Sequence, residues 1–194
     1  MSGVSGDLLD HYARTLIARA PDLHTALDIG AGRGKYGRMV RELRPDVHTT
    51  AIEVDSEYVE SFGLRSLYDT VRNMPAHRLL ESPDAEWDLV TLGDVLEHMP
   101  KSQGLDVLHY LVYRARYLWV QYPNHYRQGS LAGHASEAHM SVWTRADFDA
   151  LHADYLWYES SFLVGVVING YANAGAHIYE VMEDFGDGRT NTRD

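Results

Sequence analysis

The sequence contains no cysteine, which excludes a disulfide framework, a thiolate nucleophile and a zinc site built from cysteine. It is also poor in basic residues, because 17 Lys and Arg stand against 28 Asp and Glu, giving a formal net charge of −11. Binding to a phosphate backbone depends on clustered Lys and Arg, so this charge disfavours nucleic acid as the partner. No segment approaches the roughly 20 consecutive apolar residues that a membrane helix needs.

The beginning of the chain lacks the basic segment and apolar core of a secretory signal, so we expect a cytoplasmic protein without a membrane segment. The chain has 194 residues, of which 45% are hydrophobic and 23% charged, a composition typical of a soluble globular protein. This length favours one domain, which we place at residues 1–183. Residues 184–194 are polar and contain glycine, and we expect them to form a mobile tail.

Short apolar segments alternate with segments of helical periodicity along the chain. Strands are expected at residues 25–29, 49–54, 67–71, 87–92 and 117–122, with two later ones within 156–167 and at 177–182. Helices are expected at 8–17 (capped by Ser5), 36–43, 56–62 (capped by Ser56), 105–115 (capped by Ser102) and from a Thr144–Asp147 capping box to 151. This alternation predicts an α/β fold with a doubly wound, mostly parallel seven-stranded sheet and helices on both faces.

Ligands of such sheets bind beyond the carboxyl ends of the strands, where the first expected strand runs into a glycine-rich loop. Gly30 and Gly32 allow a tight turn and the close approach of a ligand to the backbone. The helix that follows offers free N–H groups to a polar or negative group. A dinucleotide-binding loop would have its third glycine at position 35, but the chain has Lys35 there and Gly34 before it. The loop therefore departs from the pyrophosphate-binding pattern.

Asp28 followed by Gly30, Gly32 and Gly34 resembles the first motif of the class I S-adenosylmethionine (SAM)-dependent methyltransferases. The resemblance implies SAM as the cofactor and S-adenosylhomocysteine (SAH) as the product. It further implies that the backbone of this loop lies under the methionine part of SAM. Asp28 would then help to hold the amino group of that methionine, partly through water.

Two acidic residues, Glu53 and Asp55, lie at the end of the second expected strand, roughly 20 residues after the loop, where a carboxylate can accept both ribose hydroxyl hydrogens. The resemblance favours Glu53 for the ribose and keeps Asp55 in reserve, with capping of the next helix as the alternative for Asp55. After the third strand, the resemblance implies that Asn73 reads the adenine amino group and Met74 packs against the ring. A plain loop is the alternative for these two residues.

Residues 87–98 resemble the fourth motif of the same family, in the form with Glu-His after the strand that small-molecule methyltransferases carry. The resemblance implies that Gly93 and Asp94 lie beside the SAM sulfonium and that His98 faces the acceptor. His98 is our first candidate for a general base, since imidazole titrates near neutral pH, and packing against the sheet is its alternative. His139 lies in a segment that resembles a His-x-Ser-x-Trp stretch of bacterial members, and it would either orient the substrate or anchor its loop.

A metal site is a further alternative at the end of the fourth strand. Asp94, Glu97 and His98 are spaced i, i+3, i+4, so one helical turn could place them on one face. A histidine of the following loop would complete the site (His125, His134 or His139). No spacing selects among these, and 11 histidines make chance groupings common, so we expect a site without metal.

Together these features predict an enzyme that moves a methyl group from SAM to an oxygen or nitrogen of a small-molecule acceptor. The leading helix, residues 124–141 and a second subunit of a homodimer would complete the acceptor pocket. A non-catalytic SAM-binding protein is the first alternative. A nicotinamide-dependent oxidoreductase is the second, and the spacing of the glycines argues against it.

Overall fold

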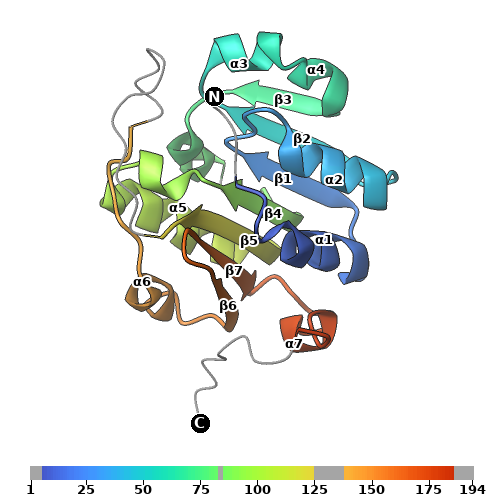
Figure 1. The fold of residues 1–194 in the computed structure, drawn as a ribbon. Helices are drawn as coiled ribbons and strands as arrows, with labels where there is room; N and C mark the ends of the chain where they lie inside the picture. Colours follow the sequence, from blue (N-terminus) through green and yellow to red (C-terminus); the bar gives the residue numbers. More distant parts are fainter. Residues whose placement is uncertain (1–5, 83–84, 125–137, 186–194) are drawn as a thin grey trace.

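The computed structural model describes residues 6–82, 85–124 and 138–185, which form a seven-stranded sheet with helices on both faces (Figure 1). The strand order is β3-β2-β1-β4-β5-β7-β6. The strands are β1 (Thr25–Ile29), β2 (His48–Glu53), β3 (Thr70–Asn73), β4 (Trp87–Gly93), β5 (Ala115–Pro123), β6 (Tyr155–Glu159) and β7 (Leu163–Asn169). The first five strands pair in parallel, and β7 pairs antiparallel with both β5 and β6. The predicted α/β fold class is therefore confirmed.

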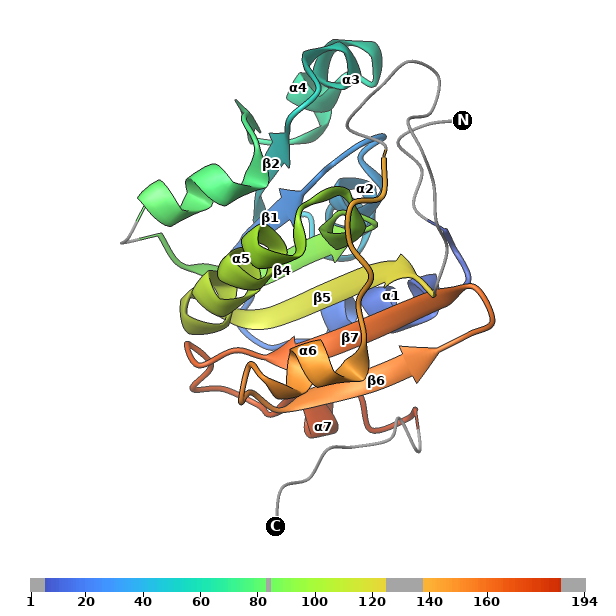
Figure 2. The ribbon, with the colours of Figure 1, turned by 90° about the vertical axis from the view of Figure 1, so that its left-hand side faces the viewer.

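Helices cover both faces of the sheet, which explains why its central strands are apolar on both sides. The α-helices are α1 (Asp10–Arg19), α2 (Lys35–Leu43), α3 (Ser56–Ser61), α4 (Leu64–Leu67), α5 (Lys101–Arg114), α6 (Arg145–Asp149) and α7 (Ile178–Val181), with 3₁₀ turns η1 (Ala76–Glu81) and η2 (Leu96–His98). Figure 2 shows α5 and α6 in front of the sheet, with α1 behind it.

Alternate residues of β5 show how the two faces divide the core. Leu118 and Val120 pack with α5, while Tyr117 and Trp119 pack with α1, α2 and α7. All four side chains are fully buried. The neighbouring strands β1 and β4 continue in opposite directions across the sheet, to β2 and to β5, so the strand order reverses between them. Ligands of doubly wound folds bind at this switch point, beyond the carboxyl ends of the strands.

One predicted element near the end of the chain differs from the structure. The expected strand at residues 177–182 is wrong, because this segment contains the helix α7, where Ile178 and Val181 are buried at helical spacing and the side chain of His177 caps the N-terminus. Both late strands instead lie within residues 155–169. Three residues join β6 to β7, and a loop this short allows only an antiparallel hairpin. Glu159, Ser160 and Ser161, where β6 ends and the turn begins, are polar.

Several boundaries also differ from the sequence prediction. The third strand begins at Thr70, because the residues just before it form α4. Asp55, not Ser56, caps α3, and Pro100 rather than Ser102 precedes α5. The capping box of Thr144 and Asp147 is confirmed. The predicted cap Ser5 lies outside the described residues.

The described chain packs as far as Phe185, two residues beyond the expected domain end, since this ring contacts His11 and Tyr12 of α1. The rest of the expected tail, 186–194, lies outside the described residues. In the described part of the chain, no helix is long and apolar enough to cross a membrane.

Candidate functional site

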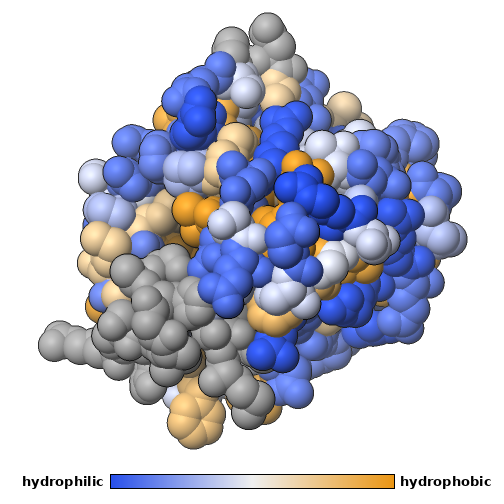
Figure 3. All heavy atoms as spheres, turned by 90° about the horizontal axis from the view of Figure 1, so that it is seen from above, coloured by the Kyte–Doolittle hydropathy of each residue, from blue (hydrophilic) through white to orange (hydrophobic). Residues whose placement is uncertain are grey.

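A cavity of about 770 Å³ opens at the carboxyl ends of β1, β2 and β4, beside the switch point of the sheet. This volume suits a ligand of drug or cofactor size, for which pockets measure roughly 300–1,000 Å³. Seven of the residues predicted to form the site line it: Gly30, Gly32, Glu53, Met74, Gly93, Asp94 and His98. Asp28, Gly34, Asn73 and His139 are not among the lining residues. Figure 3 shows apolar atoms in the middle of the upper face, surrounded by hydrophilic residues.

The glycine loop turns the chain from β1 into α2 through left-handed backbone. The angle φ is 68° at Gly30, 50° at Gly32 and 75° at Gly34, a region that side chains with a Cβ rarely adopt. A Cβ at Gly30 would also lie 2.4 Å from Val95 Cγ2, and one at Gly34 would lie 2.3 Å from Leu67 Cδ2. Gly34 is thus needed for packing under α4, whereas the backbone of Gly30 and Gly32 faces the cavity.

Asp28 lies beneath the loop instead of in the cavity wall, with an exposed fraction of 4%. Its carboxylate accepts a hydrogen bond from the Thr91 hydroxyl at 2.8 Å and another from the Tyr68 hydroxyl. The Tyr68 oxygen in turn accepts the backbone N–H of Gly37 at 3.1 Å. Asp28 therefore joins β1, β4, α2 and the end of α4 under the glycine turn. Burial raises the pKa of Asp28 from 3.8 to about 6.

This raised pKa predicts a specific pH dependence of stability. The folded chain binds the Asp28 proton more tightly than the unfolded chain, so this contribution is complete below about pH 4 and is lost as the pH rises through about 6. Asp28→Asn removes the group that titrates. Between about pH 4 and pH 6, the unfolding free energy of the wild type should therefore fall by about 3 kcal/mol more than that of the variant. Urea titrations at several pH values measure the difference.

The matched control for that comparison is Asp46→Asn, since Asp46 is an exposed aspartate. Its unfolding free energy should follow the wild-type pH dependence. Parallel curves for the wild type and Asp28→Asn would contradict the assigned effect of burial.

Glu53 ends β2 and points its carboxylate into the glycine loop. Oε2 accepts the backbone N–H of Gly32 at 2.8 Å, and Oε1 accepts that of Asp55 at 2.9 Å. The side chain is 5% exposed, and burial raises its pKa above the ordinary value for glutamate. Each carboxylate oxygen has a second lone pair, so Glu53 can hold the loop and accept further hydrogen bonds from a ligand in the cavity.

Met74 and Asn73, the pair predicted to contact adenine, have different positions. Met74 lines the cavity. The amide nitrogen of Asn73 donates to the carbonyls of Glu53 (2.7 Å) and Val54 (3.1 Å), so it fastens the end of β3 to β2. Asp55 caps α3 by accepting the backbone N–H of Glu57 at 2.9 Å, which is the alternative role considered for it.

The ring of Tyr36 requires a glycine at position 93. A Cβ at Gly93 would lie 2.1 Å from Cε2 of Tyr36, the second residue of α2. Tyr36 is buried, lines the cavity and accepts the indole N–H of Trp119 at 3.0 Å. The glycine at the end of β4 therefore provides room for a tyrosine that sets the spacing between α2 and the sheet.

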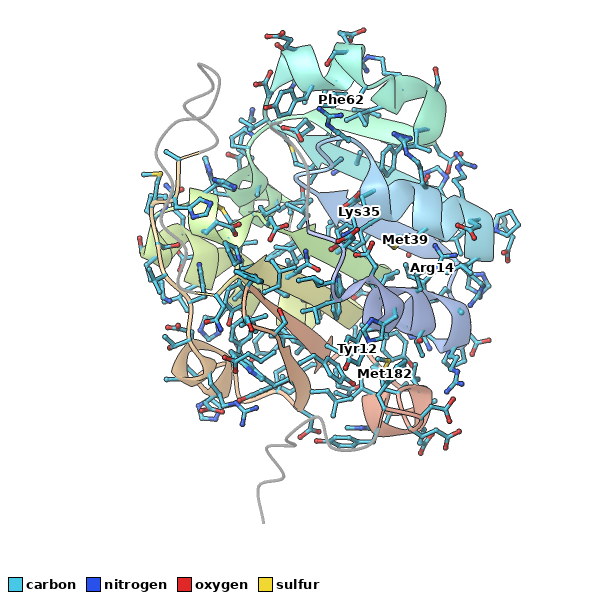
Figure 4. All side chains as sticks on the ribbon, in the orientation of Figure 1. Tyr12, Arg14, Lys35, Met39, Phe62 and Met182 are labelled. Carbon is cyan, nitrogen blue, oxygen red and sulfur yellow. The ribbon has the colours of Figure 1, made fainter. Side chains whose placement is uncertain are left out.

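The segment before α1 crosses the cavity region and is held by three side chains. Lys35 Nζ donates to the Gly6 carbonyl at 2.5 Å, and Gln121 Nε2 donates to the same carbonyl at 2.9 Å. Asp94 Oδ2 accepts the Gly6 N–H and a Gln121 Nε2 hydrogen, both at 3.2 Å. Lys35, labelled in Figure 4, also pairs with Asp10. Burial raises the pKa of Asp10. Lys35 lines the cavity although no motif predicted it there, and its position directly after the glycines was a usable signal.

His98 and His139 lie together although only His98 reaches the cavity. Their ring centroids are 5.0 Å apart in an edge-on arrangement. The Nδ1 atom of His98 lies 3.2 Å from the Ala138 carbonyl oxygen. His98 lines the cavity with Met99 and Met140. His125 and His134 lie outside the described residues.

Comparison with solved structures shows which proteins share this fold. A SAM-dependent methyltransferase from Archaeoglobus fulgidus matches with a TM-score of 0.62 and 15% identity, over 84% of this chain and 93% of that one. An O-methyltransferase family protein from Burkholderia thailandensis matches with a TM-score of 0.62 and 9% identity, over 86% of this chain but 57% of its own. The N-methyltransferase NodS from Bradyrhizobium japonicum WM9, in complex with SAH, matches with a TM-score of 0.57 and 14% identity, over 84% and 86%.

No protein-family model and no curated protein matches the sequence. The structural likeness nonetheless confirms that the chain has the α/β fold of the class I methyltransferases. A fold supports more than one chemistry, so the function has to be argued from the cavity itself.

Proposed function

We propose that this chain is a SAM-dependent methyltransferase that transfers a methyl group to an oxygen or nitrogen of a small-molecule acceptor. The observation that carries the proposal is the single cavity wall formed by residues from three strand ends: Gly30 and Gly32 after β1, Glu53 at the end of β2, and Gly93 at the end of β4. When bound, SAM supplies a methyl group activated by its positive sulfur. The task of the chain is to hold this group in line with the acceptor and to exclude water.

The chemistry of the cavity wall fits this cofactor. The Glu53 carboxylate can accept hydrogen bonds from a pair of ribose hydroxyls while it holds the Gly32 N–H. Ile52, Met74 and Tyr58 form an apolar lining near the same end, which suits a planar base. The glycine backbone allows the polar amino-acid part of a ligand to approach closely. Asp28 acts here as a positioning residue under the loop, since its oxygens accept the Tyr68 and Thr91 hydroxyls.

The other end of the cavity provides the acceptor side. His98, Met99, Gln103 and Met140 line it. A carbonyl can only accept, so the bond to Ala138 places a hydrogen on Nδ1 of His98. In the neutral imidazole, Nε2 then carries a lone pair, which is the form that a general base requires. The ring of His139 packs edge-on against the ring of His98.

The acceptor we propose is a small molecule, because the net charge of −11 opposes binding of a nucleic acid backbone. The absence of cysteine supports a reducing compartment, and we propose the cytoplasm.

Calorimetry with SAM and SAH tests the cofactor assignment. We expect a micromolar dissociation constant and a stoichiometry of one per chain, with folding checked by circular dichroism. A folded protein that takes up neither compound would overturn the proposal. Labelled SAM incubated with metabolite extracts tests the transfer itself, since a non-catalytic SAM-binding protein would bind the cofactor and label nothing.

A further inference from the structure

Three side chains that can bind a metal ion meet at the acceptor end of the cavity. Glu97 and His98 belong to the turn η2 directly after β4, and His139 comes from the segment that precedes α6. One ligand atom from each lies within 4.8 Å of the other two. Asp94 is not in this group, and its Oδ2 accepts the Gly6 N–H and a Gln121 amide hydrogen. Among the described residues, His139 is the histidine of the following segment that joins Glu97 and His98.

Backbone hydrogen bonds hold the two segments together independently of these side chains. The N–H groups of Met140 and Ser141 both donate to the Glu97 carbonyl, at 2.6 Å and 3.1 Å. The Ser141 hydroxyl donates to the Leu96 carbonyl at 3.0 Å. His139 is consequently placed beside His98 by neighbouring backbone, so the cluster is preorganised and a substitution of His139 leaves its support intact.

The orientation of His98 is that of a metal ligand. Its Nδ1–H donates to the Ala138 carbonyl, which leaves Nε2 as the nitrogen able to bind an ion. Nε2 lies 3.8 Å from Glu97 Oε1. This separation exceeds a hydrogen bond, which spans about 2.7–3.2 Å. Two atoms that each bind one ion at about 2.1 Å are separated by about 3–4 Å, which matches the observed distance.

Glu97 is the most buried of the three residues, with an exposed fraction of 3%. His98 reaches the cavity, whereas Glu97 and His139 are not among its lining residues. An ion bound to all three would therefore keep an open side toward the cavity, as catalytic metal sites with two histidines and one carboxylate do.

We propose that Glu97, His98 and His139 bind one divalent transition-metal ion, which coordinates the acceptor heteroatom. Two imidazoles and one carboxylate favour Zn²⁺, Co²⁺, Ni²⁺ or Mn²⁺ over Mg²⁺ and Ca²⁺. This inference rests on the proposed function for its acceptor, and it revises the expectation of a site without metal. A coordinated hydroxyl loses its proton to water more readily than a free one, which would relieve His98 of the role of base.

Titration of the chelator-treated chain with Co²⁺ and Zn²⁺, in the absence of SAM, tests the site directly. We expect one ion per chain with micromolar or tighter affinity, visible Co²⁺ absorption bands, and displacement of Co²⁺ by Zn²⁺. His139→Ala should weaken binding about 100-fold, and Glu97→Gln should do so as well. His24→Ala, which removes an exposed histidine, should bind the ion as the wild type does.

Uptake of no ion by the wild type, or equal binding by His139→Ala and the wild type, would overturn the metal site. Calorimetry with SAH on the same samples separates the two proposals. Binding of SAH without metal uptake contradicts only the ion, and metal uptake without SAH binding contradicts only the methyltransferase. Circular dichroism identifies a variant that has lost its fold, and His139→Ala remains decisive if Glu97→Gln does not fold.

Discussion

Gly30→Ala is expected to weaken SAM binding by about 100-fold, or about 2.7 kcal/mol. The left-handed φ of 68° alone costs a residue with a Cβ about 1–2 kcal/mol. The added Cβ would also lie 2.4 Å from Val95 Cγ2, so the loop or the start of the segment after β4 has to move. Both border the cavity, and the backbone N–H of Gly30 is bonded to the Ile52 carbonyl at 2.8 Å. Calorimetry with SAM and with SAH measures the loss.

Gly63→Ala is the matched control, because it carries the same backbone strain without the collision. The angle φ is 63° at Gly63, and a Cβ there would meet nothing within 4 Å. Gly63→Ala should lower the unfolding free energy by about 1 kcal/mol and leave SAM affinity unchanged. If Gly30→Ala binds SAM as tightly as Gly63→Ala does, the loop is not the cofactor site that we propose.

Glu53→Ala is expected to lower SAM affinity at least as strongly, by about 100- to 1,000-fold. It removes the acceptor proposed for the ribose hydroxyls, and charge-assisted hydrogen bonds of this kind are worth about 1.5–3 kcal/mol each. It also leaves the Gly32 and Asp55 N–H groups without the oxygens that now hold them. Glu53→Gln should lie between the wild type and Glu53→Ala, since an amide keeps one acceptor oxygen. Glu60→Ala, on the exposed side of α3, is the control and should bind normally.

The pH dependence of affinity gives a second readout for Glu53. Burial holds the pKa of Glu53 above the ordinary value for glutamate. As the pH falls, Glu53 should therefore take up a proton, and SAM binding should weaken, at a higher pH than if its carboxylate were exposed. Glu53→Gln cannot titrate and should lose this component. Equal pH profiles for the two proteins would show that the carboxylate does not contact the cofactor.

The parallel half of the fold could be predicted because its signals are local. The strands β1, β2, β4 and β5 are short apolar segments that end near glycine, proline or acidic residues, and the sequence shows these boundaries directly. The reversal at β7 is different. It depends on a turn at Ser160, whose hydroxyl accepts the Leu163 N–H at 2.9 Å, and the polar residues at this turn do not by themselves show that the next strand reverses direction.

The same distinction holds within the site. Motifs located Gly30, Gly32 and Glu53 because their spacing is fixed by one strand–loop–helix unit and the strand beside it. The burial of Asp28 could not be predicted, since Tyr68, its hydroxyl partner, lies 40 residues away. The meeting of His98 with His139 likewise depends on hydrogen bonds between η2 and residues 140–141, across more than 40 positions of sequence.

The attachment of Gly6 has a practical consequence for handling the protein. The Gly6 N–H donates to Asp94 in the turn after β4, and the Gly6 carbonyl accepts from Lys35 of α2 and Gln121 of β5. An affinity tag or a deletion ahead of α1 therefore acts on the cavity wall and not on a neutral end of the chain. Measurements of ligand affinity are better made on protein purified through its carboxyl terminus, with the amino terminus left native.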